Sequence, residues 1–259
     1  MDFMNGSTAE PVLLPGERLE PLARDVSVIV GGAHTFNTDT ILLAAYSLPR
    51  KGELCADFGT GSGTIPLVWC ARADPALVSA VELQKDACSM LERSAALNGL
   101  TGKIRVIRED IKNLPSSGVL PKGGLDRIAC NPPYKPAGTG VQSEDGSARL
   151  ARHETACGFS DIAAAASSLL RWGGRFFFCM RPERLCETLE TLRTAGLEPK
   201  RLRFVQQRRE KAPFLFLAEA VRGGKPGIRV DPVLLVEAED GSWSEEMLAV
   251  YGEYKENHR

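Results

Sequence analysis

Two short segments carry the residues whose types and spacing indicate chemistry. The first is the glycine-rich stretch Asp57-Phe58-Gly59-Thr60-Gly61-Ser62-Gly63, and the second, starting 68 residues after Gly63, is Asn131-Pro132-Pro133-Tyr134. A glycine-rich turn between a strand and a helix lets a nucleotide-like ligand approach the backbone. The second segment supplies an amide, a fixed backbone carbonyl and an aromatic face. These groups can bind a flat ring that carries an amine. The pair, in this order, indicates a site where S-adenosylmethionine meets an exocyclic amine.

The second segment supplies two acceptors for the two hydrogens of such an amine. The amine of adenine, or of an amide, is a weak nucleophile because its lone pair is delocalised. Acceptance by the Asn131 side-chain oxygen and the Pro132 carbonyl draws the nitrogen toward tetrahedral geometry. Pro132 and Pro133 restrict the backbone and hold this carbonyl in place, while Tyr134 offers a face for stacking. We therefore predict that the catalytic residues are Asn131, Pro132, Pro133 and Tyr134; a simple Pro-Pro turn after a strand is the alternative.

The glycine spacing favours S-adenosylmethionine over a nicotinamide. A dinucleotide fingerprint needs its third glycine one residue later, where this chain has Thr64. Glu82 ends the next expected strand, about where a carboxylate holds ribose hydroxyls. Asp110 can accept a hydrogen bond from the adenine amine of the cofactor; a helix cap or a solvated loop acid is the alternative. The predicted cofactor-binding residues are Asp57, Phe58, Gly59, Thr60, Gly61, Gly63, Glu82, Leu83, Asp110, Ile111 and Asn131.

Alternating strands and helices must position these segments. The pattern predicts strands over 53–58, 77–83, 104–108, 125–130, 175–180, 200–205 and 214–221, with helices over 63–73, 84–97 and 161–171. Such alternation indicates a doubly wound, mostly parallel seven-stranded sheet of the Rossmann-like kind, in which ligands bind at the carboxyl ends of the strands. The short link between the last two strands implies an antiparallel edge strand.

The chain divides into three predicted parts. Residues 1–50 form a lead-in with a hairpin and a helix that cover the cofactor site. Residues 51–230 form the catalytic domain, and the acidic segment 231–259 forms a C-terminal appendage.

Composition and charge limit the kinds of partner and the cellular compartment that we expect for this protein. The net charge of −1 does not suggest nucleic acid binding, but nine basic residues lie between positions 200 and 229. With Lys135, Arg152 and His153 as predicted substrate-binding residues, they indicate an RNA partner; a solvated charged face is the alternative. Seven scattered cysteines without a Cys-x-x-Cys pair predict neither disulfides nor a metal site. With no evident signal peptide and only short apolar runs, we expect a cytoplasmic protein without membrane contact.

The chain resembles the bacterial tRNA(Val) adenine-N6 methyltransferases, within the class I S-adenosylmethionine-dependent methyltransferases. Beyond the two segments above, the similarity rests on stretches 34–43, 151–154, 199–205 and 219–227, and it extends from about residue 25 to 250. The resemblance implies methylation of an adenine beside the anticodon of a tRNA.

Other functions share the broad motifs. A protein glutamine methyltransferase uses the same chemistry at an amide nitrogen, and an rRNA guanine methyltransferase carries similar segments. A cofactor-binding module without catalysis is a third alternative, which the intact Asn131 and Tyr134 disfavour. A DNA adenine methyltransferase is disfavoured because no segment is long enough for a separate recognition domain.

Overall fold

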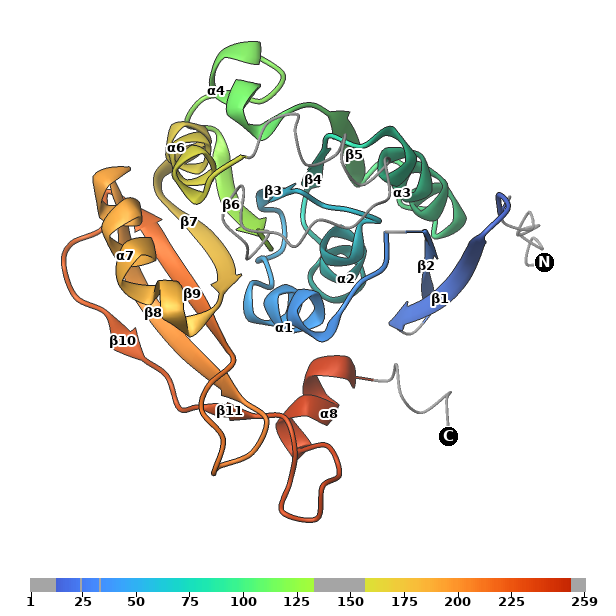
Figure 1. The fold of residues 1–259 in the computed structure, drawn as a ribbon. Helices are drawn as coiled ribbons and strands as arrows, with labels where there is room; N and C mark the ends of the chain where they lie inside the picture. Colours follow the sequence, from blue (N-terminus) through green and yellow to red (C-terminus); the bar gives the residue numbers. More distant parts are fainter. Residues whose placement is uncertain (1–12, 24, 33, 133–156, 253–259) are drawn as a thin grey trace, which may run out of the picture.

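The computed structural model describes residues 13–23, 25–32, 34–132 and 157–252. Its centre is a sheet in the order β10-β8-β9-β7-β6-β3-β4-β5, with β11 also paired to β8 (Figure 1). The strands of this sheet are β3 (Leu54–Phe58), β4 (Leu77–Glu82), β5 (Ile104–Arg108), β6 (Leu125–Cys130), β7 (Leu170–Met180), β8 (Leu197–Gln206), β9 (Leu215–Arg222), β10 (Arg229–Val230) and β11 (Leu234–Leu235). Strands β3 to β7 pair in parallel, and β9 lies antiparallel between β7 and β8. The mostly parallel sheet is therefore confirmed.

The helices and a separate hairpin complete the fold. The hairpin consists of β1 (Glu17–Ala23) and β2 (Val26–Gly31). The helices are α1 (Thr38–Tyr46), α2 (Thr64–Ala73), α3 (Lys85–Leu97), α4 (Leu114–Ser117), α6 (Phe159–Leu169), α7 (Leu185–Thr194) and α8 (Glu245–Tyr251), with 3-10 turns η1 (Ile111–Asn113) and η2 (Pro182–Arg184).

The two faces of the sheet are covered by different helices. One apolar core joins α1, α2, α3, the hairpin and α8 to side chains such as Cys55, Ala129 and Phe177. The other joins α4, α6 and α7 to the alternate side chains, such as Phe58 and Phe178. Because successive strand side chains point to opposite faces, this alternation indicates which residues at the strand ends face α1.

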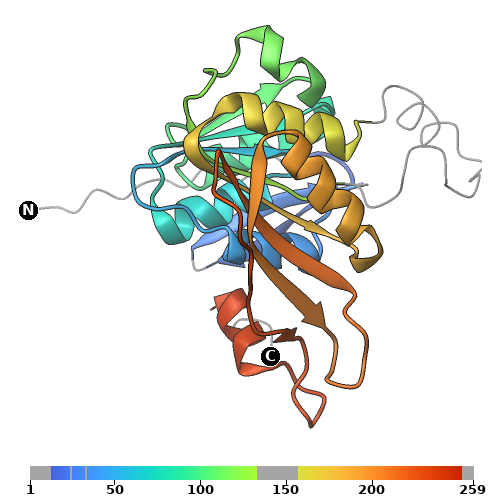
Figure 2. The same cartoon turned by 90° about the vertical axis from the view of Figure 1, so that its left-hand side faces the viewer.

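Several predicted bounds shift by one to five residues, and two differences change the description of the sheet. The predicted sheet has seven strands, and the structure adds the short β10 and β11, which run along β8. Figure 2 shows this C-terminal stretch beside the long β8–β9 pair, with α8 at its end. The helix predicted to continue to residue 171 ends at Leu169, and β7 begins directly at Leu170. Backbone pairing of Leu170 with Leu125 of β6 ends the helix before its predicted last residue.

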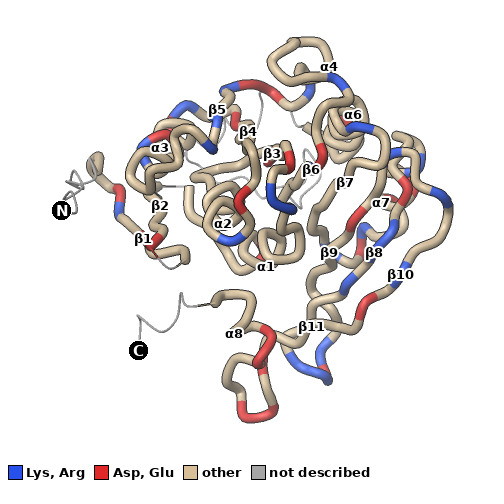
Figure 3. The backbone as a smooth tube through the Cα atoms, turned by 180° about the vertical axis from the view of Figure 1, so that it is seen from behind, with Lys and Arg blue, Asp and Glu red and all other residues tan. Residues whose placement is uncertain are grey.

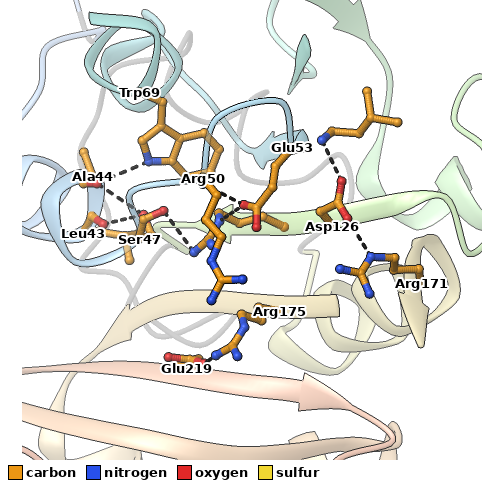
Figure 4. A network of polar contacts seen from close by, with 12 residues as sticks. Leu43, Ala44, Ser47, Arg50, Glu53, Trp69, Asp126, Arg171, Arg175 and Glu219 are labelled. Carbon is orange, nitrogen blue, oxygen red and sulfur yellow. Dashed lines mark hydrogen bonds and ion pairs between the residues drawn. The ribbon is translucent and has the colours of Figure 1, made fainter. Parts of the chain in front are cut away.

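A polar network at the amino ends of the strands anchors α1 (Figure 4). The buried Arg127 guanidinium donates to Glu53 Oε2 at 2.8 Å and to the Ser47 carbonyl at 3.4 Å, and it lies 4.7 Å from the Phe177 ring centroid. The Trp69 indole donates to the Ala44 carbonyl at 3.2 Å. These contacts fix the last turn of α1 against both α2 and the sheet.

Candidate active site

The predicted site residues gather at the carboxyl ends of adjacent strands. Asn131 follows β6, the glycine loop follows β3, Glu82 ends β4, and Asp110 follows β5. Since these four strands are neighbours in the sheet, their parallel pairing brings all four segments to one edge. The backbone confirms this, because Gly59 N and Thr60 N donate to the Val81 carbonyl at 2.9 and 3.0 Å.

The three glycines of the loop serve different purposes. Each has a positive φ, 70° at Gly59, 55° at Gly61 and 91° at Gly63, which disfavours any other residue. A Cβ at Gly63 would lie 2.1 Å from Leu91 Cδ1, whereas a Cβ at Gly59 or Gly61 would meet nothing within 4 Å. Gly63 therefore allows α2 to begin tightly against α3, and the other two leave open space beside the loop.

Glu82 ties the loop to the end of β4. Its carboxylate accepts from Gly61 N at 3.0 Å and from Leu83 N and Gln84 N at 2.8 and 2.9 Å. A carboxylate has about four lone-pair sites, so three backbone bonds orient it and leave acceptor capacity. That capacity suits a ribose hydroxyl. Leu83 itself is 48% exposed at this edge.

Asp57 is the most unusual group at the site. It is 1% exposed, and neither carboxylate oxygen has a hydrogen-bond partner within the described part of the chain; the Thr60 hydroxyl is equally unpaired. Burial is the main cause that raises the pKa of Asp57 to about 7; Thr60, which lies near without a well-formed hydrogen bond, opposes the rise, and Glu82 adds to it. An unpaired buried carboxylate is costly unless a cation meets it. These residues therefore fit a ligand that carries an amino group.

The Asn131 amide is held between two elements. Its Nδ2 donates to Thr40 Oγ1 of α1 at 2.9 Å, and its Oδ1 lies 3.1 Å from the Cys179 thiol of β7. Side chains two residues apart in a strand point to the same face of the sheet. Ala129, Phe177 and Cys55 face α1. The residues two positions later, Asn131, Cys179 and Asp57, therefore lie on this face as well. Pro132 is buried beside Asn131. The side chain is thus oriented before any substrate arrives.

Several predicted site residues have other contacts or lie outside the described chain. The Phe58 side chain is fully buried in the core opposite α1, so only its backbone is available to a ligand. Asp110 Oδ1 caps the 3-10 turn by accepting from Lys112 N at 3.0 Å, which is the alternative noted above, and Ile111 packs partly against the same core. Five of the predicted site residues lie outside the described ranges: Pro133, Tyr134, Lys135, Arg152 and His153.

Most of the predicted basic residues have bonding partners within the protein. Six of the nine basic residues between 200 and 229 bond to carboxylates or carbonyls: Lys200, Arg201, Arg203, Arg208, Arg222 and Arg229. Several of the acidic partners, Asp231, Glu237 and Glu246, come from the C-terminal segment, which lies beside β8 in Figure 3. Four of the six are paired with carboxylates, whereas Lys200 and Arg222 bond to backbone carbonyls and keep their charge. The four paired residues are less available to phosphate groups than the sequence pattern suggests.

Sequence and structure comparisons identify the family. Residues 34–194 match the model of the methyltransferase small domain. The chain belongs to this family. It is a methyltransferase, and S-adenosylmethionine is the methyl donor that its family uses; the unpaired Asp57 and the open space at Gly59 and Gly61 fit this cofactor.

Named relatives agree with the resemblance inferred from the sequence. A tRNA1(Val) (adenine(37)-N6)-methyltransferase of Tolumonas auensis is 31% identical over 220 residues, which cover 84% of this chain and 88% of the relative. One of Pedobacter heparinus is 28% identical over 167 residues, 64% of this chain and 68% of the relative. The resemblance to this group of methyltransferases is confirmed.

Solved structures agree on the fold. A predicted O-methyltransferase from Agrobacterium tumefaciens superposes with a TM-score of 0.66 at 18% identity, over 83% of this chain and 95% of that one. TrmN from Thermus thermophilus gives a TM-score of 0.51 at 24% identity, over 71% of this chain and 48% of that one. Within the described residues, no cluster of His, Cys, Asp and Glu could hold a metal, and no helix is long and apolar enough to cross a membrane.

Proposed function

We propose that this enzyme methylates the exocyclic N6 amine of an adenine in tRNA and that it works in the cytoplasm. The observation that carries the proposal is the oriented Asn131 amide, followed by Pro132, directly beside the glycine loop. The names of the relatives, which are tRNA adenine-N6 methyltransferases, support tRNA as the substrate and the adenine next to the anticodon as the first nucleotide to test.

The protein contributes orientation more than proton transfer. When bound, S-adenosylmethionine supplies a methyl group on a positively charged sulfur. Asp57 would hold the amino end of this cofactor, and Glu82 its ribose. Asn131 Oδ1 and the Pro132 carbonyl would each accept one hydrogen of the adenine amine and so hold its lone pair toward the cofactor. Orientation of this kind is worth roughly 7–11 kcal/mol, and the acidic product ammonium loses its proton without a dedicated base.

A small basic surface supports an RNA partner. Arg209 and Lys211 are exposed, and neither has an ion pair or side-chain hydrogen bond within the described ranges. They lie in the turn between β8 and β9. At the end of this turn, the Phe214 carbonyl accepts a hydrogen bond from the Arg181 guanidinium at 2.8 Å. Arg181 follows β7 at the same sheet edge as Asn131, so both charges lie on the side of the active site. Phosphate contacts there would give affinity without sequence information.

The activity test uses labelled S-adenosylmethionine with separate pools of unmodified tRNA, rRNA, DNA and protein. We expect label in tRNA and N6-methyladenosine in its nucleosides by mass spectrometry. Label in N2-methylguanosine or in protein glutamine would contradict the proposal.

The surface test compares two variants. Arg209→Ala/Lys211→Ala should weaken tRNA binding and reduce the slope of log affinity against log salt by about two, roughly one for each phosphate contact. Lys225→Ala is the control, because this equally exposed residue follows β9 at the opposite sheet edge. An unchanged slope in the double variant would exclude this surface.

A further inference from the structure

The first turn of α1 contacts three separate parts of the molecule. Asn37 Oδ1 caps the helix by accepting from Thr40 N at 3.0 Å. The Thr38 hydroxyl lies 3.2 Å from the Tyr251 hydroxyl of α8, and Asp39 lies 3.7 Å from Arg181 after β7. Thr40 reaches Asn131 at 2.9 Å. This turn is therefore the element that joins the lead-in segment and the C-terminal helix to the catalytic amide.

The hydrogen-bond directions around Thr40 follow from counting protons. A hydroxyl has one proton, and an amide oxygen can only accept. Thr40 Oγ1 lies 3.0 Å from Asn37 Oδ1, which must accept, so the hydroxyl proton is used there. Toward Asn131 the hydroxyl is left as an acceptor. Only the Nδ2 end of the Asn131 amide can face it.

This direction decides which end of the amide faces the substrate. With Nδ2 at Thr40, Oδ1 lies toward β7, where the Cys179 thiol, a weak donor, is 3.1 Å away. An amide oxygen is an acceptor, which is the kind of group that a substrate amine needs. A flipped amide would present N–H groups to the amine, which needs an acceptor. Fixing the flip therefore preserves the group that the chemistry requires.

We propose that Thr40 is a positioning residue for methyl transfer, whose hydroxyl, directed by Asn37, holds the Asn131 amide with its oxygen toward the substrate amine. The inference rests on the proposed role of Asn131. The anchoring of the far end of α1, through Trp69 to Ala44 and Arg127 to Ser47, keeps this hydroxyl in place (Figure 4).

The kinetic test uses three substitutions in one helical turn. Thr40→Val keeps the side-chain shape and the backbone cap but removes the hydroxyl. Thr40→Ser keeps the hydroxyl. Thr38→Val is the control, because it removes a hydroxyl that contacts Tyr251 instead of Asn131. Thr40→Val should lower kcat on tRNA roughly 10- to 100-fold, as expected for loss of a hydrogen bond and misorientation. Its KM for tRNA and its Kd for S-adenosylmethionine should change less than threefold or so. Thr40→Ser and Thr38→Val should retain kcat within about threefold.

A second test needs no activity. The side-chain NH2 resonances of Asn131, assigned by their loss in Asn131→Ala, should shift and exchange faster with solvent in Thr40→Val. They should be unchanged in Thr40→Ser and Thr38→Val.

The two tests separate the failures. If the wild-type enzyme methylates adenine, and Thr40→Val has normal kcat and unchanged Asn131 resonances, the positioning role is excluded and the proposed function stands. If the wild-type enzyme methylates no RNA, the proposed function fails, whatever the resonances show. An equal loss of kcat in Thr38→Val and Thr40→Val would indicate general damage to α1 and would overturn the specific role of Thr40.

Discussion

Both ends of the central sheet contain charged groups, but they differ in whether a buried carboxylate is left without a hydrogen-bond partner among the described residues. At the amino end, Arg127 donates to Glu53. Arg171 donates to Asp126 at 2.6 Å, and the Asp126 carboxylate also accepts from Leu54 N. At the carboxyl end, Asp57 has no partner among the described residues. Buried polar groups are normally satisfied, so the exception marks the end where a ligand completes the structure. We therefore expect the amino end to stabilise the fold and the carboxyl end to bind the cofactor.

The largest expected effect is at the carboxyl end. Asn131→Ala should lower methyl transfer roughly 100- to 1,000-fold, as loss of one preorganised hydrogen-bonding group does elsewhere. Cofactor affinity, measured by calorimetry, should stay nearly unchanged, since the glycine loop and Glu82 remain. Retained turnover would remove Asn131 from the mechanism.

The matching change at the amino end should affect stability alone. Arg127→Met leaves the mostly buried Glu53 carboxylate without its partner, with side-chain exposures of 6% and 16% in the pair. Breaking such a pair should lower the free energy of unfolding by about 3 kcal/mol, measured in urea. If cofactor affinity fell instead while stability held, the division between the two ends would be wrong.

The two kinds of glycine in the loop can be separated in the same way. Gly63→Ala should lower the free energy of unfolding by about 2 kcal/mol, because it combines a positive φ with a clash against Leu91. Gly61→Ala has the backbone strain without the clash, so it should cost about 1 kcal/mol and act mainly on cofactor binding. In a double-mutant cycle, Gly63→Ala should cost less in a Leu91→Ala background, which is itself less stable, and Gly61→Ala should cost the same in both backgrounds. Equal stability losses in both single variants would contradict the packing role of Gly63.

The smallest expected effect near neutral pH is the titration of Asp57. With a pKa of about 7, the free carboxyl is mostly neutral below pH 7 and mostly charged above it. A cationic amino group needs the charged form, so cofactor affinity should fall about tenfold for each pH unit below 7 and level off above it. Asp57→Asn should bind weakly at every pH between 5.5 and 8 and show no such slope. A wild-type affinity that is flat over this range would separate Asp57 from the cofactor.

Much of the site could be predicted because its signals are local. Strands β3 to β6, the glycine loop and Glu82 follow from apolar runs, glycine spacing and one acidic residue at a strand end. Their meeting at one edge follows from parallel pairing alone. The division of residues 1–50, 51–230 and 231–259 into separate parts remains a prediction, as do the roles of Tyr134 and His153.

Other features depend on partners that are distant in the chain. Arg201 and Arg203 of β8 are paired with acids 30 and 43 residues later, Asp231 and Glu246, and no local pattern shows that pairing. Phe58 lies within the glycine motif, yet strand alternation turns its side chain into the opposite core. Thr40 reads in sequence as a residue in a capped helix start, and its contact spans 91 residues to Asn131.

The sequence by itself determined where the backbone turns, which strands are buried and which short segments are proposed to carry the chemistry, because these depend on side-chain type and on neighbours in the chain. Only the tertiary structure decided which charges are already neutralised, which glycine is needed for packing and which way the Asn131 amide points. Those properties depend on groups brought together across the sheet, where one proton or one missing partner changes the outcome.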